Sequence, residues 1–317
     1  MSTDPDPQPS DVELHCATFL TRQGQTMQRP IAELINARYS CRTYRDEPIA
    51  ADLRSDLATF VAANTVGPFG SQARFAVVAA SPGDRQALKK LGTYGFIKGA
   101  TGFLVGAVPR GARDCEDYGF LLEQAVLRAT DLGLGTCWLG GTFTKSRFAA
   151  RLGGLEGGEI MPAVVSLGYP GDDGAGRIRE REAGSRRLPA SSLFFQERMG
   201  GPLDLQAAGD YASVLESVRM APSATNKQPW RTVRRGDDWH FYVQRNKGYG
   251  KGSALFTVLR LADLQRVDLG IAMCHFELAA RELGLTGEWT LDEPDVGTLG
   301  RGVEYTASWA ADRSAGG

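Results

Sequence analysis

The amino-acid sequence predicts a layered protein of the α+β or α/β class that contains two related halves. Short apolar runs bounded by glycine, proline and polar residues alternate with longer segments of helical periodicity, which predicts stacked layers of helix and sheet. One helical segment occurs twice along the chain. The 317 residues are 42% hydrophobic and 23% charged, which excludes a disordered chain and a coiled coil, and the length is typical of about two domains.

The first 29 residues form an extension to the rest of the chain. Residues 1–9 are acidic and rich in proline, so we expect a flexible tail there and no secretory signal. A short helix is predicted within residues 11–28. A second helix is predicted with Pro30 in its first position, and it runs into residues 38–42.

Most of the regular structure is predicted from apolar runs. Longer helices are expected over residues 117–132 and 263–283. Strands are expected over residues 75–80, 102–108, 161–169, 231–234, 240–244 and 303–309, with a hairpin turn at 236–238. A polar loop spans 170–189, and the best internal boundary lies at 200–210. The chain therefore divides into an extension (1–29), a first half (30–200) and a shorter second half (201–317).

An internal repeat supports this division. Residues 117–138 and 268–289 align without gaps at a separation of 151 residues and agree at eight of 22 positions. The identical pairs are Asp117/Asp268, Gly119/Gly270, Leu127/Leu278, Ala129/Ala280, Leu132/Leu283, Gly133/Gly284, Leu134/Leu285 and Trp138/Trp289. A weaker match, at a separation of 156, relates residues 71–75 to 227–231. Two unrelated helices could share such residues, but we favour duplication, which in one chain predicts a fused dimer.

Charge and cysteine content narrow the class of protein. The 36 basic and 37 acidic residues nearly cancel, so no global footprint for nucleic acid is present. No apolar run reaches the roughly 20 residues that span a bilayer. The five scattered cysteines predict no disulfide framework and favour a cytoplasmic protein. The three histidines are too dispersed to predict a metal site.

Two segments carry polar groups suited to an anionic or flat ligand. The first, Arg38-Tyr39-Ser40-Cys41-Arg42, supplies two guanidinium groups and a hydroxyl that can bind a phosphate. The second is Pro222-Ser223-Ala224-Thr225-Asn226-Lys227-Gln228-Pro229-Trp230, whose small and polar residues precede a strand. A solvated basic turn and a rigid proline-bounded turn are the alternative interpretations.

Two further segments are less specific. Leu139-Gly140-Gly141 follows a Gly-Leu-Gly turn, and its glycines allow a ligand to approach the backbone closely. Arg186-Arg187-Leu188-Pro189 ends the polar loop with two more cations. Taken singly, the first segment favours a helix C-cap and strand turn, and the second favours a solvated charge pair.

Together the four segments make the chain resemble the FMN-dependent nitroreductases over most of residues 30–310, in the single-chain tandem form of the TM type. This resemblance implies an α+β fold with a central mixed or antiparallel sheet flanked by helices, duplicated within the chain as a pseudo-dimer. The first half lacks a Pro-Ser-x-x-Asn element at 66–74, and the second half lacks an Arg-x-Ser-x-Arg element. The resemblance therefore implies one complete site, and one FMN, per chain.

The resemblance also implies roles for individual residues. Arg38, Ser40 and Arg187 would bind the phosphate, and Arg42 would stabilise negative charge near N1 and O2 of the flavin. Gly140 and Gly141 would direct N–H groups at O4 and N5, while Ser223 and Asn226 would hold the ring or ribityl chain. The remaining expected cofactor-binding residues are Tyr39, Leu139, Arg186, Pro222, Ala224 and Gln228, and Lys247 and Lys251 are candidates for reaching the flavin.

The activity implied is an NAD(P)H oxidoreductase. A hydride would pass from NAD(P)H through flavin N5 to a nitroaromatic, quinone or similar small acceptor in a ping-pong reaction, with no side-chain acid or base required. We expect a monomer acting as an internal pseudo-dimer, without nucleic-acid or membrane partners. The alternatives are an oxidase or dehalogenase of the same fold, an FMN-binding or ligand-sensing module without turnover, and an interaction protein with an emptied site.

Overall fold

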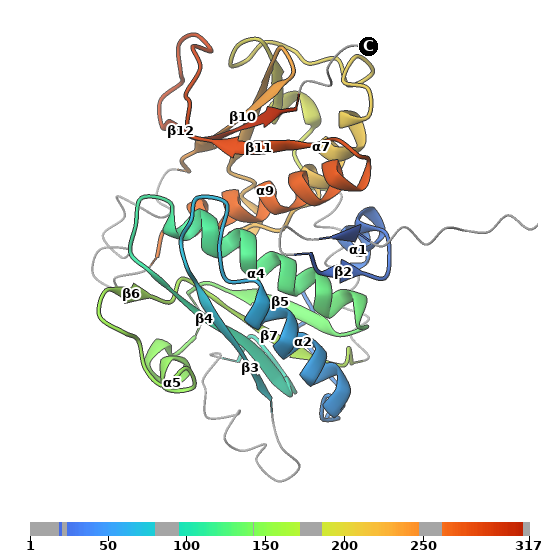
Figure 1. Cartoon of the computed structure of the whole chain (residues 1–317), viewed down its shortest axis with the longest axis vertical. Helices are drawn as coiled ribbons and strands as arrows, with labels where there is room; N and C mark the ends of the chain where they lie inside the picture. The colour runs from blue at the N-terminus through green and yellow to red at the C-terminus, as the bar shows by residue number, and fades with distance from the viewer. Residues whose placement is uncertain are drawn as a thin grey trace, which may run out of the picture.

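Two five-stranded sheets enclose a pair of long helices (Figure 1). The computed structural model describes residues 19–20, 24–79, 95–141, 143–171, 186–246 and 262–312. The two sheets lie at opposite ends of the molecule, and the helices α4 (Asp114–Asp131) and α9 (Leu264–Glu282) pack against each other between them. The structure thus confirms the α+β class, with one sheet in each half.

The first half contains an antiparallel sheet in the order β3-β4-β7-β5, and β6 adds to β4. Its elements are β1 (Phe19–Leu20), β2 (Thr26–Met27), α1 (Ile31–Ala37), α2 (Ala51–Ala63), β3 (Arg74–Ala79), β4 (Gly102–Pro109), α4, β5 (Gly135–Leu139), α5 (Lys145–Ala150), β6 (Glu159–Ile160) and β7 (Val164–Gly168). Strands β4 and β7 are buried along nearly their whole length because helices cover the sheet, so they have a continuous apolar sequence.

The second half contains a mixed sheet in the order β11-β12-β10-β9-β8, in which only the β8–β9 pair is parallel. Its elements are β8 (Phe194–Gln196), α7 (Tyr211–Arg219), β9 (Trp230–Arg235), β10 (Asp238–Gln244), α9, β11 (Gly287–Thr290) and β12 (Val303–Ala311), with short 3-10 turns at Ala190–Ser192 and Ala224–Asn226. Phe276 of α9 packs against the rings of Trp239, Phe241, Trp289 and Trp309, which joins the helix to the sheet.

The crossing of α4 and α9 depends on two glycines that are equivalent in the repeat. A Cβ atom on Gly119 would lie 2.3 Å from the carbonyl oxygen of Val267, and one on Gly270 would lie 2.0 Å from that of Glu116. Both distances are far below contact distance, so any larger residue would separate the helices. Glu116 and Val267 are themselves 151 residues apart, so the two contacts are reciprocal.

The N-terminal segment differs from its prediction. Within the described part of residues 11–28, β1 and β2 form an antiparallel pair, so the predicted helix is wrong there. Pro30 is the N-cap of α1 and not its first helical residue. The helix ends at Ala37 because Arg38 has extended backbone angles, φ −66° and ψ 128°, which direct the following residues away from the helix axis.

Two other features were not anticipated. Helix α2 has only three buried side chains, Leu57, Phe60 and Val61, which leaves a weak helical pattern in the sequence. Strand β8 already belongs to the second sheet, so the chain enters that sheet before the expected boundary at 200–210. Among the described helices, none is both long and apolar enough to cross a bilayer.

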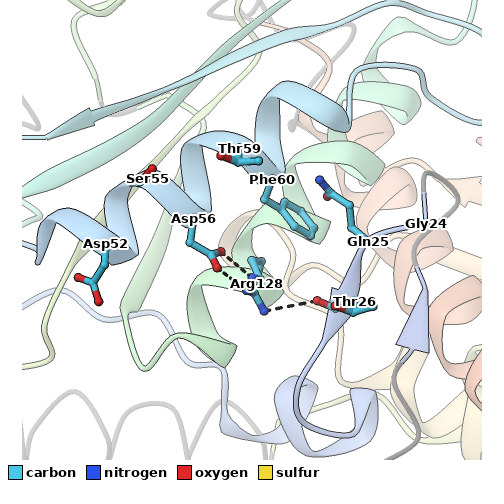
Figure 2. A pocket seen from close by; sticks show the side chains of 9 residues that line it. All are labelled: Gly24, Gln25, Thr26, Asp52, Ser55, Asp56, Thr59, Phe60 and Arg128. Carbon is cyan, nitrogen blue, oxygen red and sulfur yellow. Dashed lines mark hydrogen bonds and ion pairs between the residues drawn. The ribbon is translucent and has the colours of Figure 1, made fainter.

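Arg128 ties α4 to the N-terminal strands and to α2 (Figure 2). Its guanidinium binds both carboxylate oxygens of Asp56 at 2.9 and 2.7 Å and Asp131 at 2.9 Å, and it also donates to the carbonyl of Thr26. These contacts form the floor of an open groove of about 590 Å³ between α2 and residues 24–26. The guanidinium makes four hydrogen bonds to these partners, so the groove has a structural cation at its base.

Candidate functional site

A cavity between the halves brings together residues that are about 180 positions apart in the sequence. It is lined from the first half by Ser40, Arg42, Cys137, Trp138, Gly140 and Ala163, and from the second half by Pro222, Ser223, Ala224, Thr225, Leu264, Val267, Asp268 and Ile271. The two segments that carry the strongest motifs, 38–42 and 222–228, therefore face the same space. Neither half could form this cavity alone.

Residues 38–42 reach the cavity by running alongside β5. Ser40 forms a parallel bridge with Thr136, and the backbone N–H of Cys41 donates to the carbonyl of Thr136 at 2.8 Å. Arg42 donates a 3.4 Å hydrogen bond to the carbonyl of Ser40. This edge pairing places the Ser40 hydroxyl and the Arg42 guanidinium next to the end of β5, where Trp138 and Gly140 also line the cavity.

Arg38 has a buried polar atom with no partner. Its side chain is 7% exposed, and its Nε atom has no hydrogen-bonding partner among the described residues. A buried cationic group left unsatisfied costs free energy, and an anionic ligand removes this cost. Arg38 is not among the residues that line the cavity, so its buried Nε does not itself contact that space.

The loop 222–228 is held in a strained conformation. Thr225, Asn226 and Gln228 have φ values of +52°, +56° and +47°. Asparagine tolerates this left-handed region, but a β-branched threonine adopts it only when surrounding contacts impose it. Pro222, Ser223, Ala224 and Thr225 of this loop all line the cavity.

Several hydrogen bonds impose this conformation. Arg187 donates to the carbonyl of Ala221 at 2.7 Å, to that of Met220 at 2.9 Å and to Asn226 Oδ1 at 3.0 Å. The Gln228 backbone N–H donates to Ser223 Oγ at 2.9 Å. The N–H of Leu188 donates to Gln228 Oε1 at 2.8 Å. Residues 187 and 188, which precede the loop by more than 30 positions, therefore hold it by hydrogen bonds.

Leu264 covers the glycine end of the cavity. A Cβ atom on Gly140 would lie 2.6 Å from Leu264 Cδ1, so the leucine side chain rests directly on the glycine backbone. The resulting cavity measures about 140 Å³, below the roughly 300–1,000 Å³ typical of ligand pockets. The Leu264 side chain therefore fills the space next to the Gly140 backbone.

A buried hydrogen-bond chain supports the Trp138 wall. The Trp138 indole donates to Glu123 Oε2 at 2.7 Å, and Glu123 Oε1 lies 3.0 Å from His275 Nε2. His275 Nδ1 lies 2.9 Å from the carbonyl of Ser217, which can only accept, so Nδ1 carries a hydrogen. Nε2 therefore completes a buried chain of hydrogen-bonding groups that runs from Ser217 through His275 and Glu123 to Trp138. Both ring nitrogens of His275 are thus engaged by buried partners within the fold.

The sequence-predicted residues divide into two groups. Ser40, Arg42, Gly140, Pro222, Ser223 and Ala224 line the cavity. The rest lie outside its lining: Arg38, Tyr39, Leu139, Gly141, Arg186, Arg187, Asn226 and Gln228. The side chains of Arg187, Asn226 and Gln228 form hydrogen bonds in or next to the loop 222–228. The contact of the residues outside the lining with a cofactor stays a prediction. Lys247 and Lys251 lie outside the described residues.

Sequence reasoning missed the contribution of α9. Leu264, Val267, Asp268 and Ile271 supply one wall of the cavity, and Thr225 joins them from the loop. The available signal was the repeat itself, since Asp268 and Asp117 are an identical pair. Only the crossing of α4 and α9 shows which face of the helix meets the motifs of the first half.

Comparisons with known proteins place the fold in a family. The structure is similar to the crystal structure of a "putative nitroreductase" from Thermotoga maritima, with a TM-score of 0.56 and 20% identity over 89% of this chain and 94% of that chain. A nitroreductase from Desulfovibrio desulfuricans in complex with FMN has a TM-score of 0.37 and 22% identity, and it covers 46% of this chain and 89% of its own. An oxidoreductase containing FMN has a TM-score of 0.44 and 22% identity, with 55% and 95% covered.

No curated protein matches the chain. A family model described as "Putative TM nitroreductase" matches residues 30–280, which is well over half of the sequence. The match spans both motif-bearing segments and the two helices that cross between the sheets. The chain therefore belongs to the TM nitroreductase family.

Proposed function

We propose that the protein is an FMN-dependent oxidoreductase that binds one FMN per chain in the cavity between its halves. The observation that carries the proposal is the meeting of Ser40 and Arg42 with Ser223 and Ala224 in one cavity. Membership in the nitroreductase family, whose solved relatives include FMN-containing proteins, supports the choice of cofactor.

The residues present are chemically suited to a phosphorylated flavin. The buried Arg38 has an unpaired Nε for an anionic group, and Arg42 adds a second cation on the same segment. Gly140 and Gly141 have no side chains to hold a planar ring away from the backbone. Arg187 would act by holding the loop 222–228 and by adding positive charge behind it.

The reaction proposed is transfer of reducing equivalents from NAD(P)H to a small acceptor such as a nitroaromatic or quinone. FMN, when bound, supplies the hydride-accepting and hydride-donating chemistry. The protein's own contribution is to bind and orient the ring, to place Arg42 where negative charge develops, and to shield one face with α9. No side-chain acid or base is needed for this work.

The reciprocal contacts at Gly119 and Gly270 support an origin by duplication. We therefore propose that the chain is a pseudo-dimer that works as a monomer, in the cytoplasm, with a small-molecule acceptor and neither nucleic acid nor membrane as a partner. The division of the chain at about residue 200 stays a proposal, and β8, which precedes this point, pairs within the second sheet.

An absorption spectrum tests the proposal directly. Purified protein, loaded with FMN if colourless, should show bound oxidised flavin that bleaches on anaerobic addition of NADH or NADPH. Reoxidation by a quinone or nitroaromatic would then complete the cycle. Protein that fails to take up FMN would contradict the proposal, and bound FMN that neither nucleotide reduces would favour a ligand-binding module without turnover.

A further inference from the structure

Asp117 and Asp268 are equivalent in the repeat, but their carboxyl groups have different partners. Asp117 accepts the backbone N–H of Phe69 with Oδ1 and that of Ser71 with Oδ2, both at 2.9 Å. Asp268 accepts the N–H of Ala224 with Oδ1 at 3.0 Å. Its Oδ2 is buried without a partner among the described residues.

The facing loops differ at a position that contacts Asp117 closely. Gly67 lies so close to Asp117 that a Cβ atom there would be 2.4 Å from the aspartate Cγ. At the separation of 156 residues, Ser223 replaces this glycine. The N–H of Lys227, equivalent to that of Ser71, donates instead to the carbonyl of Ala224 within the 3-10 turn.

Of the two equivalent aspartates, the one with the unpaired oxygen, Asp268, is the one that lines the cavity. Asp268 lines the space beside Pro222, Ser223 and Arg42, and the residue is 3% exposed. Asp117 does not line this cavity, and both of its oxygens are used within the first half. The Asp268 carboxyl is therefore the buried polar group of this wall that still has hydrogen-bonding capacity.

Burial also favours the protonated form of the Asp268 carboxyl. Removal from water raises the pKa of Asp268 well above its usual value, the Ala224 N–H opposes this shift, and the like charge of Asp263 adds to it. A protonated carboxyl is both donor and acceptor. In the protonated form, with Oδ1 accepting from Ala224, Oδ2 would carry the hydrogen and act as the donor.

We propose that Asp268 is a further flavin-contacting residue, whose protonated carboxyl donates a hydrogen bond from Oδ2 to an acceptor atom of the ring bound in this cavity. The inference rests on the proposed function, because it assigns a contact within the same site. With this contact, α9 would form one wall of the cavity and would also supply a hydrogen bond to the flavin.

Infrared difference spectroscopy of the full-length protein, apo against FMN-loaded, tests the assignment. The wild type should show a shift of a protonated-carboxyl C=O band when FMN binds. Asp268→Asn should abolish this shift while retaining an acceptor for Ala224, and Asp117→Asn, its repeat equivalent, should leave it intact. A residue that served only to anchor the loop would not move this band on ligand binding.

A titration of the same proteins with FMN separates the possible failures. Asp268→Ala should weaken FMN binding about fivefold, the effect of one neutral hydrogen bond, whereas Asp117→Ala should lower thermal stability and leave affinity unchanged. Flavin uptake without the band shift, or a shift that persists in Asp268→Asn, overturns this inference alone. Failure of the wild type to bind FMN overturns the proposed function and this inference with it.

Discussion

Gly119 and Gly270 occupy reciprocal positions in the crossing of α4 and α9, each against the backbone of the other helix. A Cβ on either glycine would meet a carbonyl oxygen at 2.3 Å or less. The contact partners, Val267 and Glu116, are related by the same separation of 151 residues as the glycines. Symmetry of this kind sets the distance between the two sheets, and thereby the width of the cavity between the halves.

Gly270→Ala should strongly destabilise the protein, because the added methyl group would lie 2.0 Å from the Glu116 carbonyl and the helices would have to separate. We expect a loss of about 3 kcal/mol in the free energy of unfolding, as for severe overpacking. Chemical denaturation measures this loss. Gly111→Ala is the matched control, since a Cβ there has open space around it, and an equal loss in both variants would contradict the interpretation.

Arg38→Ala should weaken FMN binding about tenfold or more, because a charge-assisted hydrogen bond to phosphate contributes about 1.5–3 kcal/mol. Fluorescence titration of the apo protein gives the dissociation constant. Arg45→Ala serves as the control, since Arg45 is exposed and lies over the ring of Tyr169. Unchanged affinity in Arg38→Ala would remove Arg38 from the proposed phosphate site.

Leu264→Ala should accelerate the uptake of FMN by the apo protein several-fold, because the side chain that rests on Gly140 would no longer have to rotate away. Stopped-flow measurement of flavin quenching gives the association rate. The exposed Leu283, near the other end of α9, provides the control variant Leu283→Ala, whose rate should equal that of the wild type. Equal rates in all three proteins would show that Leu264 does not limit entry.

Arg128→Ala should cost about 2–4 kcal/mol of stability, because it leaves the carboxylate of Asp131, only 1% exposed, without its cation. Asp56→Asn should cost less than about 1 kcal/mol, since that side chain is 38% exposed and water can replace the lost contact. Thermal unfolding distinguishes the two. A larger effect for Asp56 than for Arg128 would reverse this interpretation.

His240 should make stability fall in mild acid. Burial lowers the pKa of His240 below 6.5, so the unfolded state takes up its proton first as the pH decreases. Its contribution is fully present above about pH 6.5 and is lost as the pH falls toward the folded-state pKa. Unfolding free energies at pH 7 and pH 5 should therefore differ less in His240→Gln than in the wild type, and an equal or greater difference would contradict the assignment.

The sequence predicts the elements whose periodicity is strong. The helices α4 and α9 lie within three residues of their predicted bounds because each is amphipathic and is followed by a glycine at positive φ, Gly133 and Gly284. Helix α2 escapes prediction because it buries one narrow stripe of side chains. Residues 11–28 look helical from local cap spacing, whereas the described part of that segment pairs as strands.

The site could be predicted in part for a related reason. Motifs local in sequence identified Ser40, Gly140 and Ser223, all of which line the cavity. The side chain of Asn226 is engaged by Arg187 within the loop, an orientation set by a left-handed backbone that no residue pattern reveals. The sequence marked Asp268 only as an identical position of the repeat. Its position in the cavity wall depends on how two helices that are distant in the sequence cross.

One consequence concerns the behaviour of the site at low protein concentration. Ser40 comes from the first half of the polypeptide and Ser223 from the second half, and both line the cavity. Because one chain carries both walls, dilution of the protein does not separate them. Tethering of this kind corresponds to an effective concentration on the order of millimolar. It also lets a mutation alter one wall without altering the other, a freedom that an assembly of identical subunits does not have.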